Sequence, residues 1–574
     1  IELNLSTVSY YNINDIYPKA DEEPMSALAK VKLYTAVHWK GLVIFLTPLI
    51  FLFDTFYPGK NNYQWTAYCL CVMAVYWVTE CIPLPVTSFL PLVIFPMTGV
   101  LETGEVCRSY MNDTLFMFIG SLILAYSVEQ SGLHLRLAYG MIRLIGYSHV
   151  KLLLSLCIVT TFISMWITNT AATTMMVPLC FAVLRVFESQ NLLNVYTKNS
   201  EGEDVATDIT VCYFCTITYS ATVGGIGTLI GTGTNLVFKG LFMTQYPSAP
   251  EYLSFPLYSA FAVPMMLALA ASTFLSMAFV YLGLLRPNSK AAKETNITPD
   301  AMRALKKQVE ADWKRLGMLT YWEIMVIILF GGGIIAFFCR SPQIFKGWGD
   351  AILEYYEIKD KKLDSALAMF VSFLMFLLPS NLDFFKNFTA KYKEDLPKER
   401  IRSVLDWRLV ITQLPYSFCF LLGGGFALSD AARKTGLNEK IGEVLQGLKD
   451  LPNVIILLMI IIVVVFVTNF ASNVAVCNVV APIAMQMAKE INRNPLWYDL
   501  AAGIAASFCF MIPVGTPGNL VVQSAAKIPT TKMVTILRAL PTVFAIIIIW
   551  IMVYFFAPVV WPDIHSLPQW VDGL

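Results

Sequence analysis

The sequence predicts an all-α polytopic membrane protein that is built as an inverted repeat. Three observations support this prediction: the composition, a series of long apolar stretches, and motifs that recur in the same order in both halves of the chain. The 574 residues are 56% hydrophobic and only 14% charged, whereas soluble proteins carry roughly a quarter charged residues. The composition therefore favours a chain that lies largely within a lipid bilayer.

Nine apolar stretches are long enough, or nearly so, to cross the hydrocarbon core of a bilayer, which takes about 20 helical residues. They cover residues 42–57, 66–79, 84–101, 114–128, 255–285, 323–339, 366–379, 454–469 and 534–560. Their continuous apolar character predicts helices that pass through the membrane several times.

Basic segments predict the orientation of the chain. Residues 286–320 and 386–408 are rich in Lys and Arg, and the N-terminal tail also carries several lysines. Because cytoplasmic loops are enriched in these residues, we expect the tail (1–38) and the 286–320 loop to be cytoplasmic and the C-terminal tail (561–574) to be extracellular. The formal net charge is only +1, which gives no support for a nucleic-acid partner.

An internal repeat relates the two halves. The segment "FIGSLILAYSVEQSGLH", which begins at Phe118, resembles "LLGGGFALSDAARKTGLN", which begins at Leu421, so that Gly120 matches Gly424 at an offset of 304 residues. The same offset places Asn169 on Asn473. A second pair, "GTGTN" at 231–235 and "GTPGN" at 515–519, has an offset of 284, and an extra charged loop around 188–208 accounts for the difference.

The repeat predicts two halves that share one order of elements. The first half, residues 39–285, would hold spans 1–6, with a re-entrant hairpin at 152–187 and a broken helix at 209–245. The second half, residues 321–560, would hold spans 7–11, with a hairpin at 453–490 and a broken helix at 498–526. If an odd number of crossings separates equivalent points, the halves run in opposite directions, as in many secondary transporters.

Four short polar segments interrupt the apolar surroundings, at 168–170, 231–235, 472–473 and 515–519. A break in a membrane helix frees backbone N–H and C=O groups, which is tolerated only where protein or a water-filled cavity satisfies them. Helix N-termini attract anions, and unwound carbonyls coordinate small cations. We therefore expect a binding site for an anion and for coupling cations. For any one segment, close helix packing is the simpler explanation.

Two other classes of protein remain as alternatives. A polytopic membrane enzyme would need reactive groups, but the four histidines lie in tails or at span ends, and HExxH, GxSxG and Walker motifs are absent. A channel would not need two hairpins with matching breaks. No catalytic residue is predicted, and Cys212 and Cys215, despite their CxxC spacing, are expected to pack as small hydrophobic residues.

Five segments resemble the signatures of a known family: "WITNTAATTMMVP", "GGIGTLIGTGTN", "LGGGFALS", "ASNVAVCNVVAP" and "MIPVGTPGN". They are similar to those of the divalent anion/sodium symporter family, the di- and tricarboxylate and citrate transporters, and most of all to animal and insect I'm-Not-Dead-Yet type carriers. The resemblance runs from about His38 to the "WPDIHSLPQW" tail. It implies an elevator-type transporter with about 11 transmembrane helices plus two re-entrant hairpins, working as a homodimer.

The resemblance also implies roles for particular residues. The substrate would meet the hairpin tips and the broken helices at Thr168, Asn169, Thr170, Thr234, Ser472, Asn473, Val474 and Thr516. One sodium site would use Ser164, Thr168, Asn169 and the Gly233 carbonyl, and the other Thr468, Ala471, Asn473 and the Gly515 carbonyl. The broken-helix backbone would be shaped by Gly231, Thr232, Asn235, Pro517 and Asn519.

Several positions depart from the family pattern. Thr168 stands where Ser is usual, Val474 where some relatives have Thr, and Gly518 and Thr234 where Pro is common. These changes leave the coupling open between sodium symport and sodium-independent anion exchange. The predicted function is secondary transport of Krebs-cycle anions such as succinate and citrate across the plasma membrane, with sodium the only ion that would be coupled and no other cofactor. A sulfate or other divalent oxyanion carrier is the alternative within transport.

Overall fold

The computed structural model describes residues 27–56, 62–198, 204–284, 299–342, 344–357, 363–392, 400–445, 451–512, 515–529 and 540–572, with a few positions between them. Residues 1–26 of the predicted cytoplasmic tail and 290–298 of the predicted basic loop lie outside the described residues.

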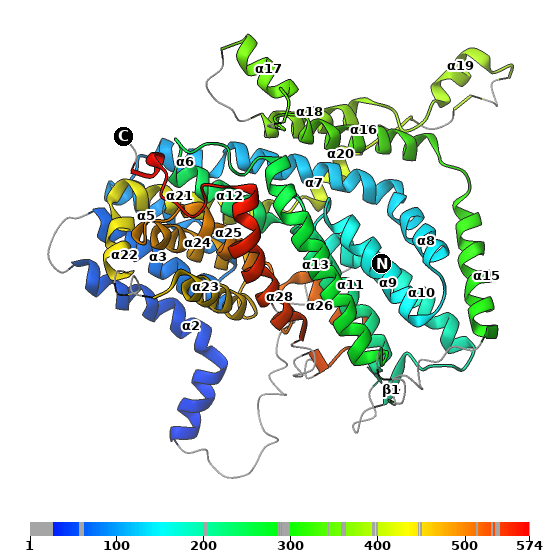
Figure 1. Cartoon of the computed structure of the whole chain (residues 1–574), viewed down its shortest axis with the longest axis horizontal. Coiled ribbons are helices and arrows are strands. Elements are labelled where there is room, and N and C mark those ends of the chain that lie inside the picture. The colour runs from blue at the N-terminus through cyan, green and yellow to red at the C-terminus, as the bar shows by residue number, and fades with distance from the viewer. Residues whose placement is uncertain are drawn as a thin grey trace.

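The first half of the chain is almost entirely helical in its described part (Figure 1). Its helices are α2 (Ala27–Phe56), α3 (Asn62–Thr79), α4 (Leu84–Thr87), α5 (Leu90–Thr98), α6 (Thr103–Tyr110), α7 (Asp113–Ser131), α8 (Leu133–Ile145), α9 (His149–Ser164), α10 (Asn169–Ser189), α11 (Asp208–Gly225), α12 (Gly233–Gln245) and α13 (Phe255–Tyr281). The strands β1 (Tyr196–Lys198) and β2 (Asp204–Ala206) form one antiparallel pair in the loop between α10 and α11.

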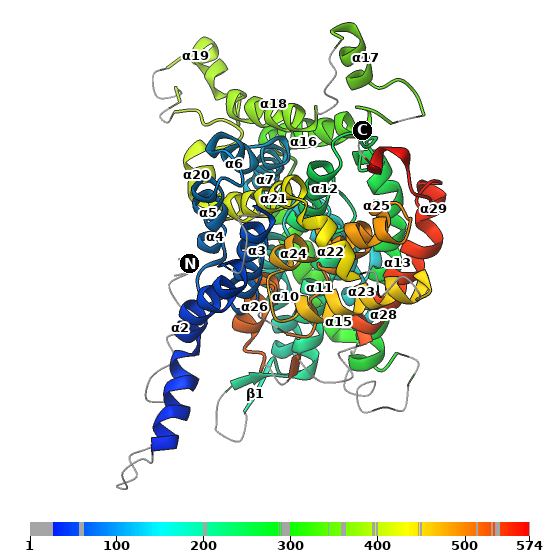
Figure 2. The same cartoon turned by 90° about the vertical axis from the view of Figure 1, so that its left-hand side faces the viewer.

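The rest of the chain is also almost entirely helical in its described part. Its helices are α15 (Pro299–Leu316), α16 (Tyr321–Phe338), α17 (Trp348–Tyr355), α18 (Asp364–Leu377), η1 (Asp383–Phe385), α19 (Lys386–Thr389), α20 (Trp407–Gln413), α21 (Tyr416–Thr435), α22 (Leu437–Leu445), α23 (Asn453–Thr468), α24 (Asn473–Glu490), α25 (Pro495–Ala505), α26 (Pro517–Ala526), α28 (Leu540–Ile551), η6 (Met552–Phe556), α29 (Ala557–Val560) and η7 (Gln569–Asp572). Helix α2 extends away from the body of the molecule, and α17 and α19 project from α16 and α18 (Figure 2).

Six helices in the described part are long and apolar enough to cross a membrane. They are Lys30–Leu52, Thr103–Ser131, Asn169–Ser189, Phe255–Tyr281, Tyr321–Phe338 and Leu540–Val560. The pair α20 and α21, bent by 56°, would make a seventh, and four shorter apolar stretches are Leu84–Thr98, His149–Ser164, Asp364–Leu377 and Asn453–Thr468. Helix breaks explain why uninterrupted long helices are fewer than the expected crossings.

Large apolar side chains cover much of the surface. Phe45 is 75% exposed, Ile335 65% and Phe466 65%. Such exposure would be unfavourable in water over a large area, but it is what a surface facing lipid tails requires. The structure is therefore that of a multi-pass membrane protein.

The sequence repeat is visible in the backbone. Helices α7 to α12 correspond in order to α21 to α26. At equivalent positions, Gly132 ends α7 with a φ of 72° and Gly436 ends α21 with a φ of 75°, a left-handed conformation that glycine adopts without steric cost. Pro178 and Pro482 also occupy equivalent places inside α10 and α24.

Buried ion pairs fasten distant helices to each other. Arg136 on α8 lies 2.5 Å from Glu323 on α16, and its guanidinium donates to the carbonyls of Leu316, Gly317 and Met318. Glu323 also completes the capping box of Thr320 at the start of α16. This pair therefore fixes the α15–α16 corner against α8.

A second buried group of charges joins α12 to α18. Lys239 Nζ lies 3.2 Å from Asp364 Oδ2, and Arg340 Nε lies 2.6 Å from Asp364 Oδ1. Arg340 also pairs with Glu251. The four side chains form what we call the α12–α18 ion cluster, in which each buried charge has a partner of opposite sign.

The Arg136–Glu323 pair gives a prediction about stability. Replacing Arg136 by Met leaves the Glu323 carboxylate buried without its cation, and breaking a buried pair in this way costs about 3–5 kcal/mol. We expect a clear fall in the thermal unfolding midpoint of the detergent-purified protein. Arg136→Met combined with Glu323→Gln should recover part of the loss. Arg303→Ala is the matched control, because Arg303 and its partner Asp300 are both more than four-fifths exposed. A wild-type midpoint for Arg136→Met would contradict the assigned role.

Candidate functional site

The first hairpin turns at a group of linked polar side chains. Helix α9 ends at Ser164 and α10 begins at Asn169, with Thr168 as the N-cap residue whose hydroxyl accepts a hydrogen bond from the Ala171 N–H at 3.4 Å. Ser164 Oγ lies 3.1 Å from Asn169 Oδ1 and 2.6 Å from the carbonyl oxygen of Ala221 on α11. The hairpin tip is thus tied to the broken helix that follows it.

The second hairpin repeats this arrangement with the equivalent residues. Thr468 Oγ1, at the end of α23, lies 2.8 Å from Asn473 Oδ1 at the start of α24 and 2.7 Å from the carbonyl oxygen of Ala506. Asn473 Nδ2 lies 3.4 Å from the carbonyl oxygen of Ser507. In both halves a hydroxyl, an amide oxygen and a backbone carbonyl therefore meet at the hairpin tip.

In each broken helix, an asparagine side chain donates hydrogen bonds to backbone carbonyls at the break. Asn235 Nδ2 donates to the carbonyls of Gly225 and Thr228 at 2.9 and 2.8 Å. Asn519 Nδ2 donates to the carbonyls of Cys509 and Ile512 at 2.9 and 3.3 Å. All these positions are related by the 284-residue offset, so the two breaks are satisfied in the same way.

Glycines let each break approach its hairpin tip. A Cβ atom on Gly225 would lie 2.2 Å from Asn169 Oδ1, one on Gly231 would lie 2.9 Å from the Met165 carbonyl, and one on Gly515 would lie 2.5 Å from the Thr468 carbonyl. No side chain fits at those distances. A Cβ on Gly233, whose carbonyl is predicted to bind sodium, would lie 2.6 Å from Phe418 of α21.

Each broken helix also contacts the hairpin of the other half. Thr218 Oγ1 on α11 donates to Asn519 Oδ1 at 2.9 Å, and a Cβ on Gly518 would lie 3.2 Å from Thr173 Oγ1 on α10. Conversely, α12 packs against α24 and α25. In Figure 1 the hairpins α9–α10 and α23–α24 lie on different sides of the molecule, and α12 and α26 connect them.

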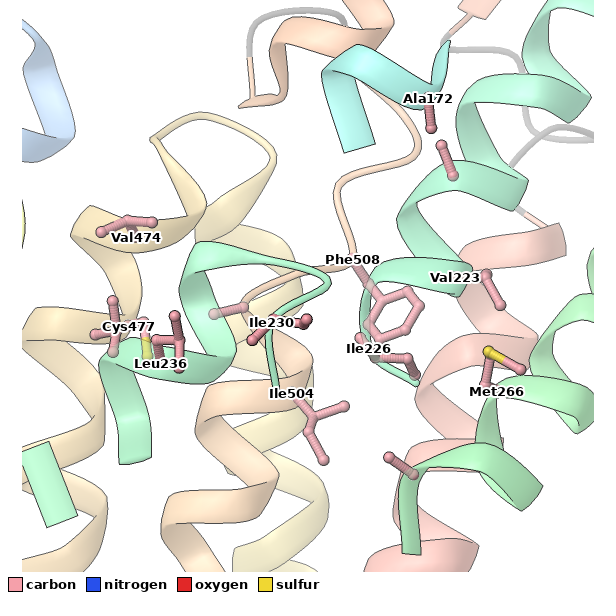
Figure 3. Close-up of a cluster of buried hydrophobic side chains, with 14 of the residues drawn as sticks. Ala172, Val223, Ile226, Ile230, Leu236, Met266, Val474, Cys477, Ile504 and Phe508 are labelled. Atoms are coloured by element: carbon pink, nitrogen blue, oxygen red, sulfur yellow. The ribbon is translucent and has the colours of Figure 1, made fainter. Parts of the chain in front are cut away.

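The predicted substrate residues differ in accessibility. Five of them are half-buried, namely Thr168, Asn169, Thr170, Ser472 and Asn473. Val474 is 4% exposed, and Figure 3 shows its side chain in an apolar cluster that includes Leu236 and Cys477. Ala471, predicted to contribute its backbone, is fully buried. Val474 therefore packs in the core and leaves the polar contacts to its neighbours.

The start of each second helix segment has unused polar groups. Neither N-cap side chain, Thr232 of α12 or Thr516 of α26, bonds to its own helix. The hydroxyls of Thr234 and Thr516 are buried and have no hydrogen-bond partner in the described part of the chain. N–H groups at a helix start, together with free hydroxyls, suit an anion.

Sequence reasoning missed several polar residues in this region. Asn469 fastens the second tip to the second break, since its Nδ2 donates to the Val465 carbonyl at 2.7 Å and its Oδ1 accepts from the Met511 N–H at 3.1 Å. Lys239 and Asp499 are fully or nearly fully buried charges within α12 and α25. Each is a charged residue in an otherwise apolar segment. This pattern could have identified them from the sequence, because ionisable groups inside membrane helices are rare.

Known proteins resemble this chain over nearly its whole length. The chain is 38% identical to "Protein I'm not dead yet" of Drosophila melanogaster, with 96% of this chain and 94% of that protein covered. It is 31% identical to the "Na(+)/citrate cotransporter" of Rattus norvegicus over 88% and 93% of the two chains.

A solved structure shares the fold. The Alcanivorax borkumensis YdaH transporter superposes with a TM-score of 0.50 at 12% identity, covering 83% of this chain and 90% of that one. Residues 74–503 match the citrate transporter family. This match spans most of the sequence, and with the level of identity to full-length relatives it is decisive: the chain belongs to the citrate transporter family.

Proposed function

We propose that this protein is a secondary carrier that moves Krebs-cycle di- and tricarboxylates, such as succinate and citrate, across the plasma membrane. The observation that carries the proposal is the pair of matching hairpin tips, each holding a hydroxyl, an amide and a backbone carbonyl beside a broken helix. The names of the relatives, which include a Na(+)/citrate cotransporter, support carboxylates as the substrate class.

The substrate carboxylates would be held by neutral donors. The amide groups of Asn169 and Asn473 and the free hydroxyls of Thr234 and Thr516 are available for this, together with the N–H groups at the starts of α12 and α26. Lys239, on α12, is already paired with Asp364. An anion without a fixed positive partner is held less tightly, which suits a carrier that must release it.

The same tips offer ligands for sodium as a transported ion. Hard cations bind oxygen ligands, and Ser164 with Asn169, and Thr468 with Asn473, each bring a hydroxyl and an amide oxygen within about 3 Å of one another. Sodium symport would use these ligands, whereas sodium-independent anion exchange would not need a bound sodium ion.

Transport would follow an elevator motion. The moving part would consist of the two hairpins (α9–α10 and α23–α24) and the two broken helices (α11–α12 and α25–α26), which contact one another across the repeat. The remaining helices of the halves 39–285 and 321–560 would form the fixed part and a homodimer contact. The basic loops support a cytoplasmic N-terminus and an extracellular C-terminus.

The two tip asparagines give a direct test of the site. In proteoliposomes, Asn169→Ala and Asn473→Ala should each abolish uptake of radiolabelled succinate and citrate, because each removes both an amide donor and a cation ligand. Size-exclusion chromatography of each variant should still show folded protein. Thr174→Ala is the control: its exposed hydroxyl donates to the Thr170 carbonyl one turn earlier in α10, and uptake should be unchanged. Normal uptake by both asparagine variants would refute the site.

The breaks give a second prediction. Asn235→Ala and Asn519→Ala each leave two buried carbonyls without their donor, and an unsatisfied buried group costs about 1–3 kcal/mol. We expect a lower unfolding midpoint together with reduced uptake. Asn519→Ala should have the larger effect, because it also removes the acceptor of Thr218. Unfolding midpoints equal to that of the wild type would show that the breaks do not depend on these amides.

The coupling mode is tested by changing the ions and dicarboxylates in the solutions outside and inside the vesicles. Succinate uptake should be accelerated either by an inward sodium gradient, relative to choline, or by unlabelled dicarboxylate inside the vesicles. The first result would identify a symporter and the second an exchanger. Uptake that responds to neither would exclude both of these coupling modes, and uptake that equals uptake by empty vesicles would contradict transport.

A further inference from the structure

Asp499 on α25 is a buried carboxylate that the proposed substrate site does not use. Its side chain is 0% exposed, and every residue of α25 is buried. Neither carboxylate oxygen has a hydrogen-bond partner in the described part of the chain. Buried carboxylates are normally hydrogen-bonded or paired, so this one needs an explanation.

In the described part of the chain, no cation lies within hydrogen-bond distance of Asp499. The elements that pack against α25 are α12, α23, α24, α28 and η6, and their titratable groups are Lys239 on α12, Cys477, Lys489 and Glu490 on α24, and Tyr554 on η6. Lys239 pairs with Asp364, and Lys489 and Glu490, at the C-terminal end of α24, do not hydrogen-bond to Asp499. Cys477 lies on α24, which packs against α25, and a thiol carries no positive charge.

The dipole of α25 does not replace the missing cation. Asp499 is the fifth residue of the helix, and the stabilisation of an anion by a helix N-terminus falls off within the first turn. An ionised carboxylate without a partner in such a place costs several kcal/mol. The group must therefore hold a proton, or a metal ion, whenever the region is closed.

The surroundings favour a proton over sodium. A hard cation needs several oxygen ligands, whereas neither carboxylate oxygen of Asp499 has a polar partner within hydrogen-bond distance in the described part of the chain. Among the described residues, no group of three or more His, Cys, Asp or Glu side chains is placed to hold a metal ion.

Asp499 is connected to the proposed substrate site through two helices. Along α25 it precedes Ala506, whose carbonyl contacts Thr468, by seven residues, or about 10 Å at 1.5 Å per residue. On α24, Cys477 follows Asn473 by four residues, which places both on one helix face. A change of charge at Asp499 therefore acts on the two helices that form the second tip.

The repeat shows that the fold does not need an acid here. The 284-residue offset places Asp499 on Cys215 of α11, which is buried and uncharged, and the 304-residue offset places Cys477 on Thr173 of α10. The first half builds the same helix contact without a carboxylate. A role in packing alone would not select an ionisable group in the second half.

We propose that Asp499 is a proton-binding site that couples carboxylate transport to proton movement. The carboxylate takes a proton from water on the side where the site opens, crosses as the neutral carboxylic acid while substrate is bound, and returns the proton to water on the other side. The inference rests on the proposed transport function. It adds a proton to the ions that move with the substrate.

The test uses the full-length protein in proteoliposomes that contain a pH-sensitive dye. With wild type, external succinate should acidify the vesicle interior, and for one coupled proton each unit of inward pH gradient should raise succinate accumulation about tenfold. Asp499→Asn, which keeps the shape and removes the titratable proton, should lose both effects while labelled succinate still exchanges with internal succinate. Cys215→Ala, at the equivalent first-half position, should keep both effects.

Two further measurements keep the test decisive if Asp499→Asn fails to fold. Asp499→Cys copies the residue that the first half tolerates and should behave as Asp499→Asn does. In wild type, a membrane-soluble carbodiimide, which reacts with protonated carboxyl groups, should label Asp499 in a peptide map, and labelling should fall as the pH is raised.

The outcomes separate the two hypotheses. Succinate exchange without succinate-dependent acidification in wild type, acidification that persists in Asp499→Asn, or sodium movement in place of proton movement would overturn the proton site and leave carboxylate transport standing. Absence of succinate and citrate exchange in wild type would refute the transport function on which the proposal rests.

Discussion

The structure depends on one constraint, which is that every backbone polar group freed by a helix break within the bilayer needs a partner. An unpaired carbonyl or N–H costs several kcal/mol in hydrocarbon, yet the chain contains two hairpin turns and two broken helices in its interior. Asn235 and Asn519 meet the constraint for the breaks, since each amide binds two carbonyls that the helix no longer uses. The hydroxyls of Ser164 and Thr468 do the same for Ala221 and Ala506.

At the other end of each break, the described side chains leave backbone N–H groups and hydroxyls without a partner. The carbonyls are satisfied by side chains, whereas the starts of α12 and α26 have no side-chain cap. The unwound segments therefore keep a surplus of donors, in the hydroxyls of Thr234 and Thr516 and the first N–H groups. The proposed anion site would use this asymmetry, which occurs twice because the chain is repeated.

Much of this could be predicted from the sequence because it is local or repeated. The 304-residue and 284-residue offsets identified Asn169, Asn473, Asn235 and Asn519 before any contact was known, and the spacing of Ser164 and Thr468 from these asparagines placed them at the same turns. What could not be predicted depends on how distant segments meet. Lys239 and Asp364 are 125 residues apart, and Arg136 and Glu323 are 187 apart.

The contact between Thr218 and Asn519 has a consequence for how the protein is made. These residues are 301 positions apart, so the first hairpin and its broken helix are synthesised long before the α26 segment that packs against them. Until then, Thr173 and Thr218 face a space that the second half will later occupy. The first half thus enters the membrane before the helix that covers these polar groups has been made. Its packing is completed only when nearly the whole chain has been inserted. A nascent chain that stops before α26 would present this polar surface to the quality-control machinery of the membrane.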